Sequence, residues 1–285
     1  MKKNILITGA NSYVGSNVEK WLSKEPDKYY VETLDMKDPN WKEFDFSEFD
    51  VVFHVAGIAH VSNKKSMKDL YYKVNRDLTI ETARKAKKSG VKQFIFMSSM
   101  IVYSSKEKMI TIDTKPNPDN FYGQSKLDAE LGIIELEDNK FNISVMRPPM
   151  IYGPNSNGNF PKLLKFANKT FIFPNIKNKR SMLYIDNLSI FVKNTINQNK
   201  YGIFFPQNHE YSSTTDIIKT VSTIRNKKIW FTKLFNPFIK LLRIKIGILN
   251  KVFGDYYYDI KRDILSDFLS LNDSILEIER IQSDE

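Results

Sequence analysis

The chain of 285 residues carries a formal net charge of +10, and hydrophobic residues make up 41% of it, which is enough for one large α/β domain or a domain with an appendage. It has no cysteine, which excludes disulfides, thiolate metal sites and a cysteine nucleophile; its three histidines show no metal-ligand spacing, so we expect no metal. The lysines are scattered rather than gathered in one stripe, which favours a solvated surface suited to an anionic small substrate over a nucleic-acid partner.

Strand and helix patterns alternate through the first half of the chain. Short apolar runs predict strands, and apolar residues at helical spacing predict longer helices between them. The expected strands are 4–8, 30–34, 51–55, 93–97 and 143–146, and the expected helices are 13–24, 70–89 and 123–137. This alternation predicts an α/β fold with a Rossmann-type, doubly wound parallel sheet.

The pattern becomes irregular after residue 150, where a turn-rich loop reads "GPNSNGNFP". We expect residues 1–150 to form a NAD-binding Rossmann domain, to which residues 180–205 return with a helix at 186–197. Residues 151–285 are expected to form mainly a smaller, C-terminal substrate-binding lobe, with a further helix at 213–225 that opens on serine and threonine.

The stretch 237–252 is both apolar and basic. It fits a peripheral helix on a membrane surface, and equally a lobe helix whose lysine stems lie along its buried face. Gly247 argues against one long helix. The chain shows no signal-peptide pattern and no run of about 20 uncharged apolar residues, so we expect a cytoplasmic protein without a membrane span.

A glycine-rich turn lies near the start of the chain, in "ILITGANSYVG". Gly9 and Gly15 keep the outer positions of a dinucleotide-binding turn between a strand and a helix, while Ser12 replaces the middle glycine. We expect Ser12 to cap the helix and to meet the pyrophosphate. Asp35, at the end of the second strand, is placed to accept hydrogen bonds from a ribose. These residues indicate NAD, although Lys37 leaves NADP open.

Two further segments carry chemistry. The strand in "FIFMSSMIVY" ends in Ser98 and Ser99, whose hydroxyls we expect to face the ligand crevice. In "NFYGQSKLDAE", Tyr122 and Lys126 lie four residues apart on one helix face. An ammonium beside a phenol is expected to lower the pKa of Tyr122, so that it can exchange a proton with a carbinol or ketone near neutral pH.

Together these motifs resemble the extended short-chain dehydrogenase/reductases, and among them the NAD-dependent nucleotide-sugar epimerase/dehydratase family. The resemblance runs from residue 3 to about 190. It implies that Tyr122 is the acid/base, that Lys126 also holds the nicotinamide ribose, and that Ser99 binds the reacting sugar oxygen. The resemblance also implies a set of cofactor-binding residues. In addition to Tyr122 and Lys126, these are Gly9, Ser12, Tyr13, Val14, Gly15, Asp35, Asp45, Phe46, Ala56, Gly57, Asn75 and Pro149. The implied substrate-binding residues are Ser99, Asn159, Phe160 and Arg180, of which Arg180 binds the diphosphate.

The departures from the family pattern bear on the reaction. A lysine that contacts NAD in hexose 4-epimerases falls at Ala59, and a dehydratase motif near Ser99 is missing. Phrases such as "RPPMIYGP" look more like bacterial 4-keto reductases of UDP-N-acetyl-6-deoxyhexoses in surface-polysaccharide synthesis. The resemblance therefore favours NADH-dependent reduction at C4 of a UDP-4-keto-6-deoxy-N-acetylhexosamine.

Three alternatives stay open. One is a UDP-glucose or UDP-N-acetylglucosamine 4-epimerase, which would use the same site. The second is a relative that binds NAD without catalysis, and the third is a membrane-associated factor that uses residues 237–252. By analogy with relatives, the helices at 70–89 and 123–137 could also form a homodimer face.

Overall fold

The structure is a computed structural model, and it describes residues 2–59, 65–243 and 246–284. The chain divides into two compact units, each built from three segments. Unit 1 comprises residues 1–105, 115–148 and 188–206; unit 2 comprises 106–114, 149–187 and 207–285. Residues 106–114, which fall within the predicted domain 1–150, belong to unit 2.

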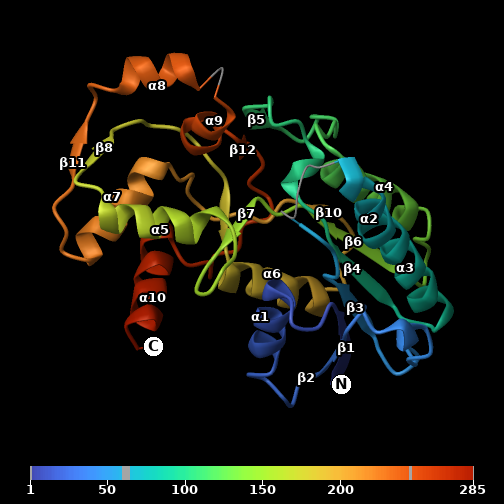
Figure 1. The fold of residues 1–285 in the computed structure, drawn as a ribbon. Coiled ribbons are helices and arrows are strands. Elements are labelled where there is room, and N and C mark those ends of the chain that lie inside the picture. The colour runs from blue at the N-terminus through green and yellow to red at the C-terminus, as the bar shows by residue number, and fades with distance from the viewer. Residues whose placement is uncertain (1, 60–64, 244–245, 285) are drawn as a thin grey trace. The chain divides into compact units, whose positions relative to one another are not determined.

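Unit 1 is built around a six-stranded, fully parallel sheet in the order β10-β6-β4-β3-β1-β2 (Figure 1). Its strands are β1 (Lys3–Thr8), β2 (Tyr29–Leu34), β3 (Val51–His54), β4 (Gln93–Met97), β6 (Asn142–Met146) and β10 (Gly202–Phe204). The chain goes from β1 outward to β2 and then returns to β3 on the other side of β1. That reversal is the topological switch point at which open α/β sheets bind ligands. The Rossmann-type sheet predicted from the alternating pattern is confirmed.

Helices cover both faces of this sheet in unit 1 (Figure 1). On one face lie α2 (Lys68–Tyr71), α3 (Leu78–Lys88) and α4 (Phe121–Ile134); on the other lie α1 (Tyr13–Leu22) and the part of α6 (Ile185–Asn197) that belongs to this unit. The predicted helix 70–89 is interrupted by a π-helical stretch, Tyr72–Asp77, between α2 and α3. The helices α3 and α4 pack on each other, and a homodimer through this pair stays a prediction.

The core of unit 1 follows from the strand sequences. All four residues of β3 and all five of β4 are buried, as expected for parallel strands covered on both faces. Short 3₁₀ turns at Pro39–Lys42, Lys65–Met67 and Met100–Val102 connect the elements. The register pairs Thr8 with Leu34 and His54, and Met97 with Met146. The carboxyl ends of the strands therefore meet at one edge of the sheet.

Unit 2 consists of three small parallel strand pairs and several helices. The pairs are β7 (Met150–Tyr152) with β9 (Met182–Tyr184), β8 (Ile172–Pro174) with β11 (Trp230–Thr232), and β5 (Met109–Ile110) with β12 (Tyr257–Tyr258). The helices are α5 (Asn159–Lys169), α7 (Thr214–Ile224), α8 (Asn236–Leu242), α9 (Gly247–Phe253) and α10 (Leu271–Asp284). Tyr152, Phe160 and Tyr184 pack ring against ring in its core.

In place of one helix around residues 237–252, the structure has two short helices: α8 ends at Leu242 and α9 begins at Gly247. None of the described helices is both long enough and apolar enough to cross a membrane.

Candidate functional site

The glycine turn forms at the end of β1 as its sequence requires. Gly9 adopts a φ of +113°, and a Cβ there would lie 2.8 Å from the backbone nitrogen of Ala56, so any side chain would be strained and would clash. Ser12 is the N-cap of α1, where its Oγ accepts a hydrogen bond from the backbone nitrogen of Gly15 at 3.1 Å. The helix cap expected of Ser12 is confirmed. Tyr13 and Val14 form the first turn of α1.

The residues around this turn fit a dinucleotide. The backbone nitrogen of Gly9 donates to the carbonyl of Leu34 at 2.9 Å, which sets the turn beside the exposed Asp35 at the end of β2. Ala56 follows β3 and donates to the carbonyl of Thr8. A helix N-terminus next to a glycine turn suits a pyrophosphate, and a carboxylate on the neighbouring strand suits a ribose.

Asn75 ties the segment after β3 to α4. It is fully buried in the π-helical stretch. Its Oδ1 accepts from the backbone nitrogen of Ile58 at 2.9 Å, and its Nδ2 donates to Ser125 Oγ at 3.2 Å. A Cβ at Gly57 would lie 3.0 Å from Asn75 Oδ1 and 3.2 Å from Lys126 Nζ. Asn75, Gly57 and Lys126 are therefore immediate neighbours, although they lie far apart in the sequence.

The start of α4 brings Tyr122 to the end of β4. Asn120 caps the helix through its Oδ1, which accepts from the backbone nitrogen of Gly123 at 2.9 Å. A Cβ at Gly123 would come within 2.4 Å of the carbonyl oxygen of Ile101, so only glycine permits this close approach. As a result, Tyr122 forms a hydrogen bond with the side chain of Ser99. Neither Asn120 nor Gly123 was predicted as a site residue, although the helix cap and the glycine are both visible in "NFYG".

The expected lowering of the Tyr122 pKa is wrong for the groups that the protein itself supplies. Burial raises the pKa of Tyr122 to about 12, assisted by Tyr71, and only the hydrogen bond with Ser99 opposes this shift. Lys126 instead donates from Nζ to the carbonyl of Met97 at 2.9 Å. Its own pKa is lowered to about 8 by burial, which Glu130 partly offsets. Burial therefore governs the pKa of Tyr122, and Tyr122 keeps its proton at neutral pH.

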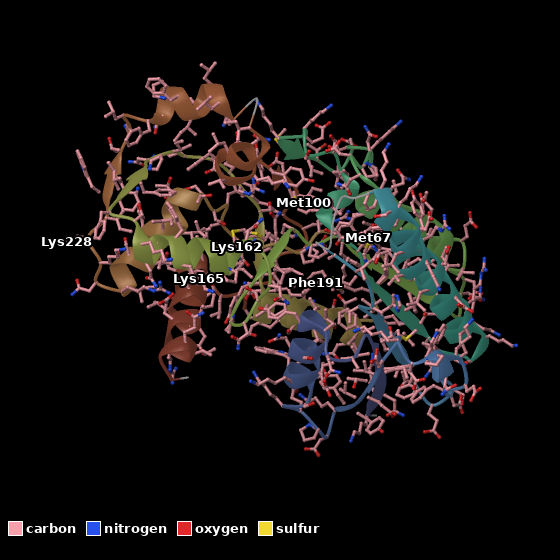
Figure 2. All side chains as sticks on the ribbon, in the orientation of Figure 1. Met67, Met100, Lys162, Lys165, Phe191 and Lys228 are labelled. Carbon is pink, nitrogen blue, oxygen red and sulfur yellow. The ribbon has the colours of Figure 1, made fainter. Side chains whose placement is uncertain are left out.

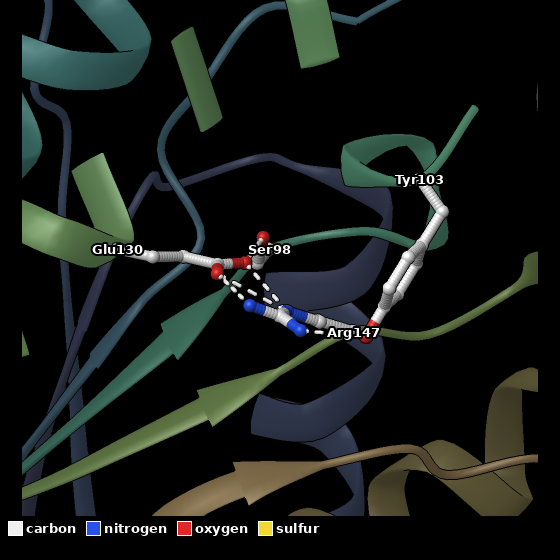
Figure 3. Close-up of polar contacts among 4 residues, drawn as sticks. All are labelled: Ser98, Tyr103, Glu130 and Arg147. Carbon is white, nitrogen blue, oxygen red and sulfur yellow. Dashed lines mark hydrogen bonds and ion pairs between the residues drawn. The ribbon is translucent and has the colours of Figure 1, made fainter. Parts of the chain in front are cut away.

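The expectation that Ser98 faces the ligand crevice is also wrong. Its hydroxyl points into unit 1 and donates to Glu130 Oε1, because successive side chains on an extended strand point to opposite faces. Figure 3 shows the carboxylate of Glu130 facing both Ser98 and Arg147. Arg147 Nε lies 3.1 Å from both carboxylate oxygens. Arg147 Nη1 also donates to Tyr103 Oη at 2.7 Å. We call these four residues the Glu130–Arg147 cluster.

The Glu130–Arg147 cluster is buried throughout, with Glu130 0% and Arg147 5% exposed. It lies beside the reacting groups, because Glu130 follows Lys126 by one helical turn and acts on the pKa of that lysine. This cluster was not predicted from the sequence. The available signal was the repeated four-residue spacing of Tyr122, Lys126 and Glu130 along one helix.

Asp45 and Phe46, which are both expected at the cofactor, differ in exposure. Asp45 is exposed, and its carboxylate accepts from the backbone nitrogen and the hydroxyl of Ser47, which lowers the pKa of Asp45. Phe46 is fully buried in the core, with its ring against Phe44 at 6.1 Å. The side chain of Phe46 therefore packs in the core.

The remaining predicted residues belong to unit 2. Pro149 is buried ahead of β7, and Asn159 and Phe160 begin α5, with Asn159 exposed and Phe160 packed against Tyr152. Arg180 donates from Nη1 to the carbonyl of Gly254 at 3.2 Å, and burial lowers its pKa. Unit 1 thus gathers the cofactor turn with Ser99, Tyr122 and Lys126. Unit 2 holds Asn159, Phe160 and Arg180, which are expected at the substrate, and Pro149, which is expected at the cofactor.

Two known proteins are similar to this one over nearly the whole chain. A UDP-glucose 4-epimerase of Vibrio cholerae is 29% identical over 294 residues, covering 91% of this chain and 88% of the relative. An N-acetyl-α-D-glucosaminyl-diphospho-ditrans,octacis-undecaprenol 4-epimerase of Escherichia coli O157:H7 is 28% identical, covering 90% and 83%.

The fold is shared with solved structures as well. The UDP-glucuronic acid 4-epimerase of Bacillus cereus, solved with NAD, superposes with a TM-score of 0.75 at 22% identity, over 98% of this chain and 99% of that one. The sequence profile of the NAD dependent epimerase/dehydratase family matches residues 5–204, which contain the glycine turn, Ser99, Tyr122 and Lys126. The chain belongs to the NAD dependent epimerase/dehydratase family.

Proposed function

We propose that this protein reduces a 4-keto sugar carried on a nucleoside diphosphate, with a UDP-4-keto-6-deoxy-N-acetylhexosamine as its substrate. The observation that carries the proposal is the state of Tyr122. Its phenol is hydrogen-bonded with Ser99, and burial raises its pKa to about 12. A phenol that keeps its proton at neutral pH is suited to protonate the oxygen of a ketone undergoing reduction.

Three side chains divide the work at the sugar carbonyl. Ser99 holds the oxygen in line with Tyr122, and Tyr122 gives its proton to that oxygen as negative charge develops there. Lys126, whose Nζ lies 2.9 Å from the carbonyl of Met97, provides a fixed positive charge that favours the phenolate left behind. Bound NADH supplies the hydride in such chemistry, and the Gly9 turn with Asp35 and Asn75 would hold it.

The substrate residues are proposed on the chemistry of their side chains. A guanidinium such as that of Arg180 matches a diphosphate through its fork of donors. Asn159 and Phe160, at the start of α5, would contact the nucleotide. The uridine base and the 6-deoxy-N-acetyl sugar rest on the resemblance of "RPPMIYGP" and "GNFPKLL" to 4-keto reductases.

A 4-epimerase is the second candidate, because two curated relatives bear that name. In that reaction Tyr122 would first accept the proton of the C4 hydroxyl and later return it. One of these relatives is named for a sugar diphosphate on a polyprenol carrier. Because a diphosphate is common to both carriers, Arg180 would serve either substrate.

The test offers purified protein two substrates separately, UDP-galactose and UDP-4-keto-6-deoxy-N-acetylglucosamine with NADH. Oxidation of one NADH per keto sugar is expected. Interconversion of UDP-galactose and UDP-glucose without net oxidation would replace the reductase by the epimerase. Tyr122→Phe should abolish turnover and keep dinucleotide binding, while the exposed Tyr201→Phe, 64% exposed, keeps full activity. Turnover by neither route would leave a NAD-binding protein without catalysis.

A further inference from the structure

The helix α8 carries an uncovered apolar stripe. Phe238, Leu241 and Leu242 follow the i, i+3, i+4 spacing that places side chains on one helix face. They are 68%, 69% and 43% exposed, and α8 buries none of its residues. A helix with such a stripe normally packs it against a core. The alternative in which the lysine stems cover a buried face is therefore wrong for α8.

The neighbouring ribbon of β8 and β11 adds aromatic side chains to this exposed surface. Trp230 of β11 pairs with Ile172 of β8, and its backbone nitrogen donates to the carbonyl of Phe171. Trp230 is 71% and Phe171 76% exposed. The helix starts beside this ribbon, since Asn236 Nδ2 donates to the carbonyl of Asn175, just after β8. We call the ribbon and α8 together the basic apolar surface.

Charge is segregated along the sequence that builds this surface. Residues 217–254 contain nine lysines and arginines and no Asp or Glu, whereas residues 255–285 contain nine Asp or Glu. Residues 139–185, which supply β8 and α5, also lack acidic residues. Lys233 and Lys240 are exposed beside the apolar stripe. Figure 2 shows Lys228 at the edge of unit 2, ahead of β11, and Lys162 and Lys165 on α5.

We propose that unit 2 docks on an anionic lipid bilayer through the basic apolar surface. Helices that lie in a membrane interface combine leucine and aromatic side chains with flanking lysines. The apolar side chains enter the interface, and the lysines are attracted to acidic headgroups. A stripe of apolar side chains on a short helix can enter a bilayer interface without a shaped partner. A nucleic-acid surface would present cations with few exposed apolar side chains. Here six large apolar residues are exposed among the described residues between 234 and 246. This docking requires no particular reaction at the catalytic site.

The experiment is vesicle flotation of the full chain, with phosphatidylcholine vesicles and with vesicles that also contain phosphatidylglycerol. The protein should float only with the anionic vesicles and should be released by salt. The double variant Phe238→Ser with Leu241→Ser should lose at least ten-fold in binding, and Lys233→Gln with Lys240→Gln several-fold. Ile112→Ser with Leu276→Ser, at exposed positions elsewhere in unit 2, is the matched apolar control. Circular dichroism and turnover of a water-soluble substrate verify that each variant is folded.

Other partners of the basic apolar surface would give different results. Absence of flotation with anionic vesicles, or flotation that survives both double substitutions, overturns the proposal. A dimer in sedimentation that Phe238→Ser with Leu241→Ser converts to a monomer, without lipid binding, assigns the surface to a second copy of the chain. Binding to a DNA fragment in place of vesicles assigns it to nucleic acid. In all of these cases the turnover measurement is unaffected, so the proposed reduction is judged separately.

Discussion

Lys126 is a buried cation at the reacting end of the sheet. It is 5% exposed, and its ammonium lies 4.6 Å from the centre of the Phe96 ring. Burial lowers its pKa to about 8, so the ammonium is charged below that pH and loses its charge above it. In the proposed reduction this charge favours the phenolate that Tyr122 becomes when it gives up its proton, so kcat/KM should fall as pH rises through about 8. A pH profile of initial rates measures this.

As a control, the folded fraction of the protein is measured at each pH of that profile. If kcat/KM stayed level well above pH 8 while the protein stayed folded, Lys126 would not supply the charge that the reaction needs. Tyr122 does not produce this fall, because its pKa of about 12 keeps it protonated over the same range.

Gly123 sets how closely α4 approaches the end of β4. A Cβ there would lie 2.4 Å from the carbonyl oxygen of Ile101 and 2.7 Å from Pro118 Cβ. Gly123→Ala should therefore push the start of α4 away from Ser99, costing about 1–3 kcal/mol of stability, as overpacking does, and lowering kcat more than it raises KM.

The control for this substitution is Gly247→Ala at the start of α9, where an added Cβ meets nothing within 4 Å. Thermal unfolding and steady-state kinetics of both variants decide the point. Equal activity in the two variants would mean that the contact at Gly123 does not position Tyr122.

At the scale of elements, α4 joins the chemistry to the buried ion pair. Tyr122, Lys126 and Glu130 follow one another at four-residue spacing, and Glu130 pairs with Arg147 at the end of β6. Glu130→Gln leaves the buried charge of Arg147 without its counterion, which costs about 3–5 kcal/mol in comparable cases. Urea unfolding should show a loss of that size.

The same substitution has a second, electrostatic result. Glu130 raises the pKa of Lys126, so its removal should move the alkaline fall of kcat/KM to lower pH. Glu130→Met combined with Arg147→Met should recover most of the stability while keeping the pH displacement. A profile that does not move in either variant would make the cluster purely structural.

The elements also show how far the sequence alone leads. The strands of unit 1 could be predicted because they are continuous apolar runs, such as "QFIFM", that are buried in the sheet. Tyr122 and Lys126 could be predicted because their four-residue spacing is a local feature of the sequence. The direction of Ser98 and the pKa of Tyr122 could not, since both depend on burial against Glu130 and Tyr71, which are distant in the sequence. The exposure of α8 was equally hidden, because a periodic apolar stripe does not say whether a core covers it.

On the scale of the whole molecule, the two units are interleaved along the chain. The last segment of unit 1, residues 188–206, completes its sheet with β10 beside β6. It also brings α6, whose Leu188, Phe191 and Val192 are 0–1% exposed. Figure 2 labels Phe191, whose ring packs against Phe204 of β10 at 5.8 Å.

A chain that ends at residue 150 should therefore fail to fold, although it contains the glycine turn and Tyr122. Removing α6 and β10 uncovers the edge of β6. It also takes from the buried Gln93 Nε2 two of its three acceptors, the carbonyls of Thr195 and Lys200, and leaves Ser144 Oγ at 3.4 Å. Each large apolar side chain contributes about 1.5–3 kcal/mol when buried. The free energy lost with several such side chains is comparable with the stability of a whole domain, which is about 5–15 kcal/mol.

The comparison chain joins residue 148 to residue 185 through a flexible linker and ends at residue 206, so that it keeps all of unit 1. It should unfold cooperatively in urea and bind NAD, whereas the chain that ends at 150 should be recovered only as aggregate. If both chains unfolded cooperatively with equal midpoints, β10 and α6 would be dispensable. Without β10, the edge of β6 exposes unpaired backbone donors and acceptors. We therefore expect the chain that ends at 150 to lose solubility first and dinucleotide binding second.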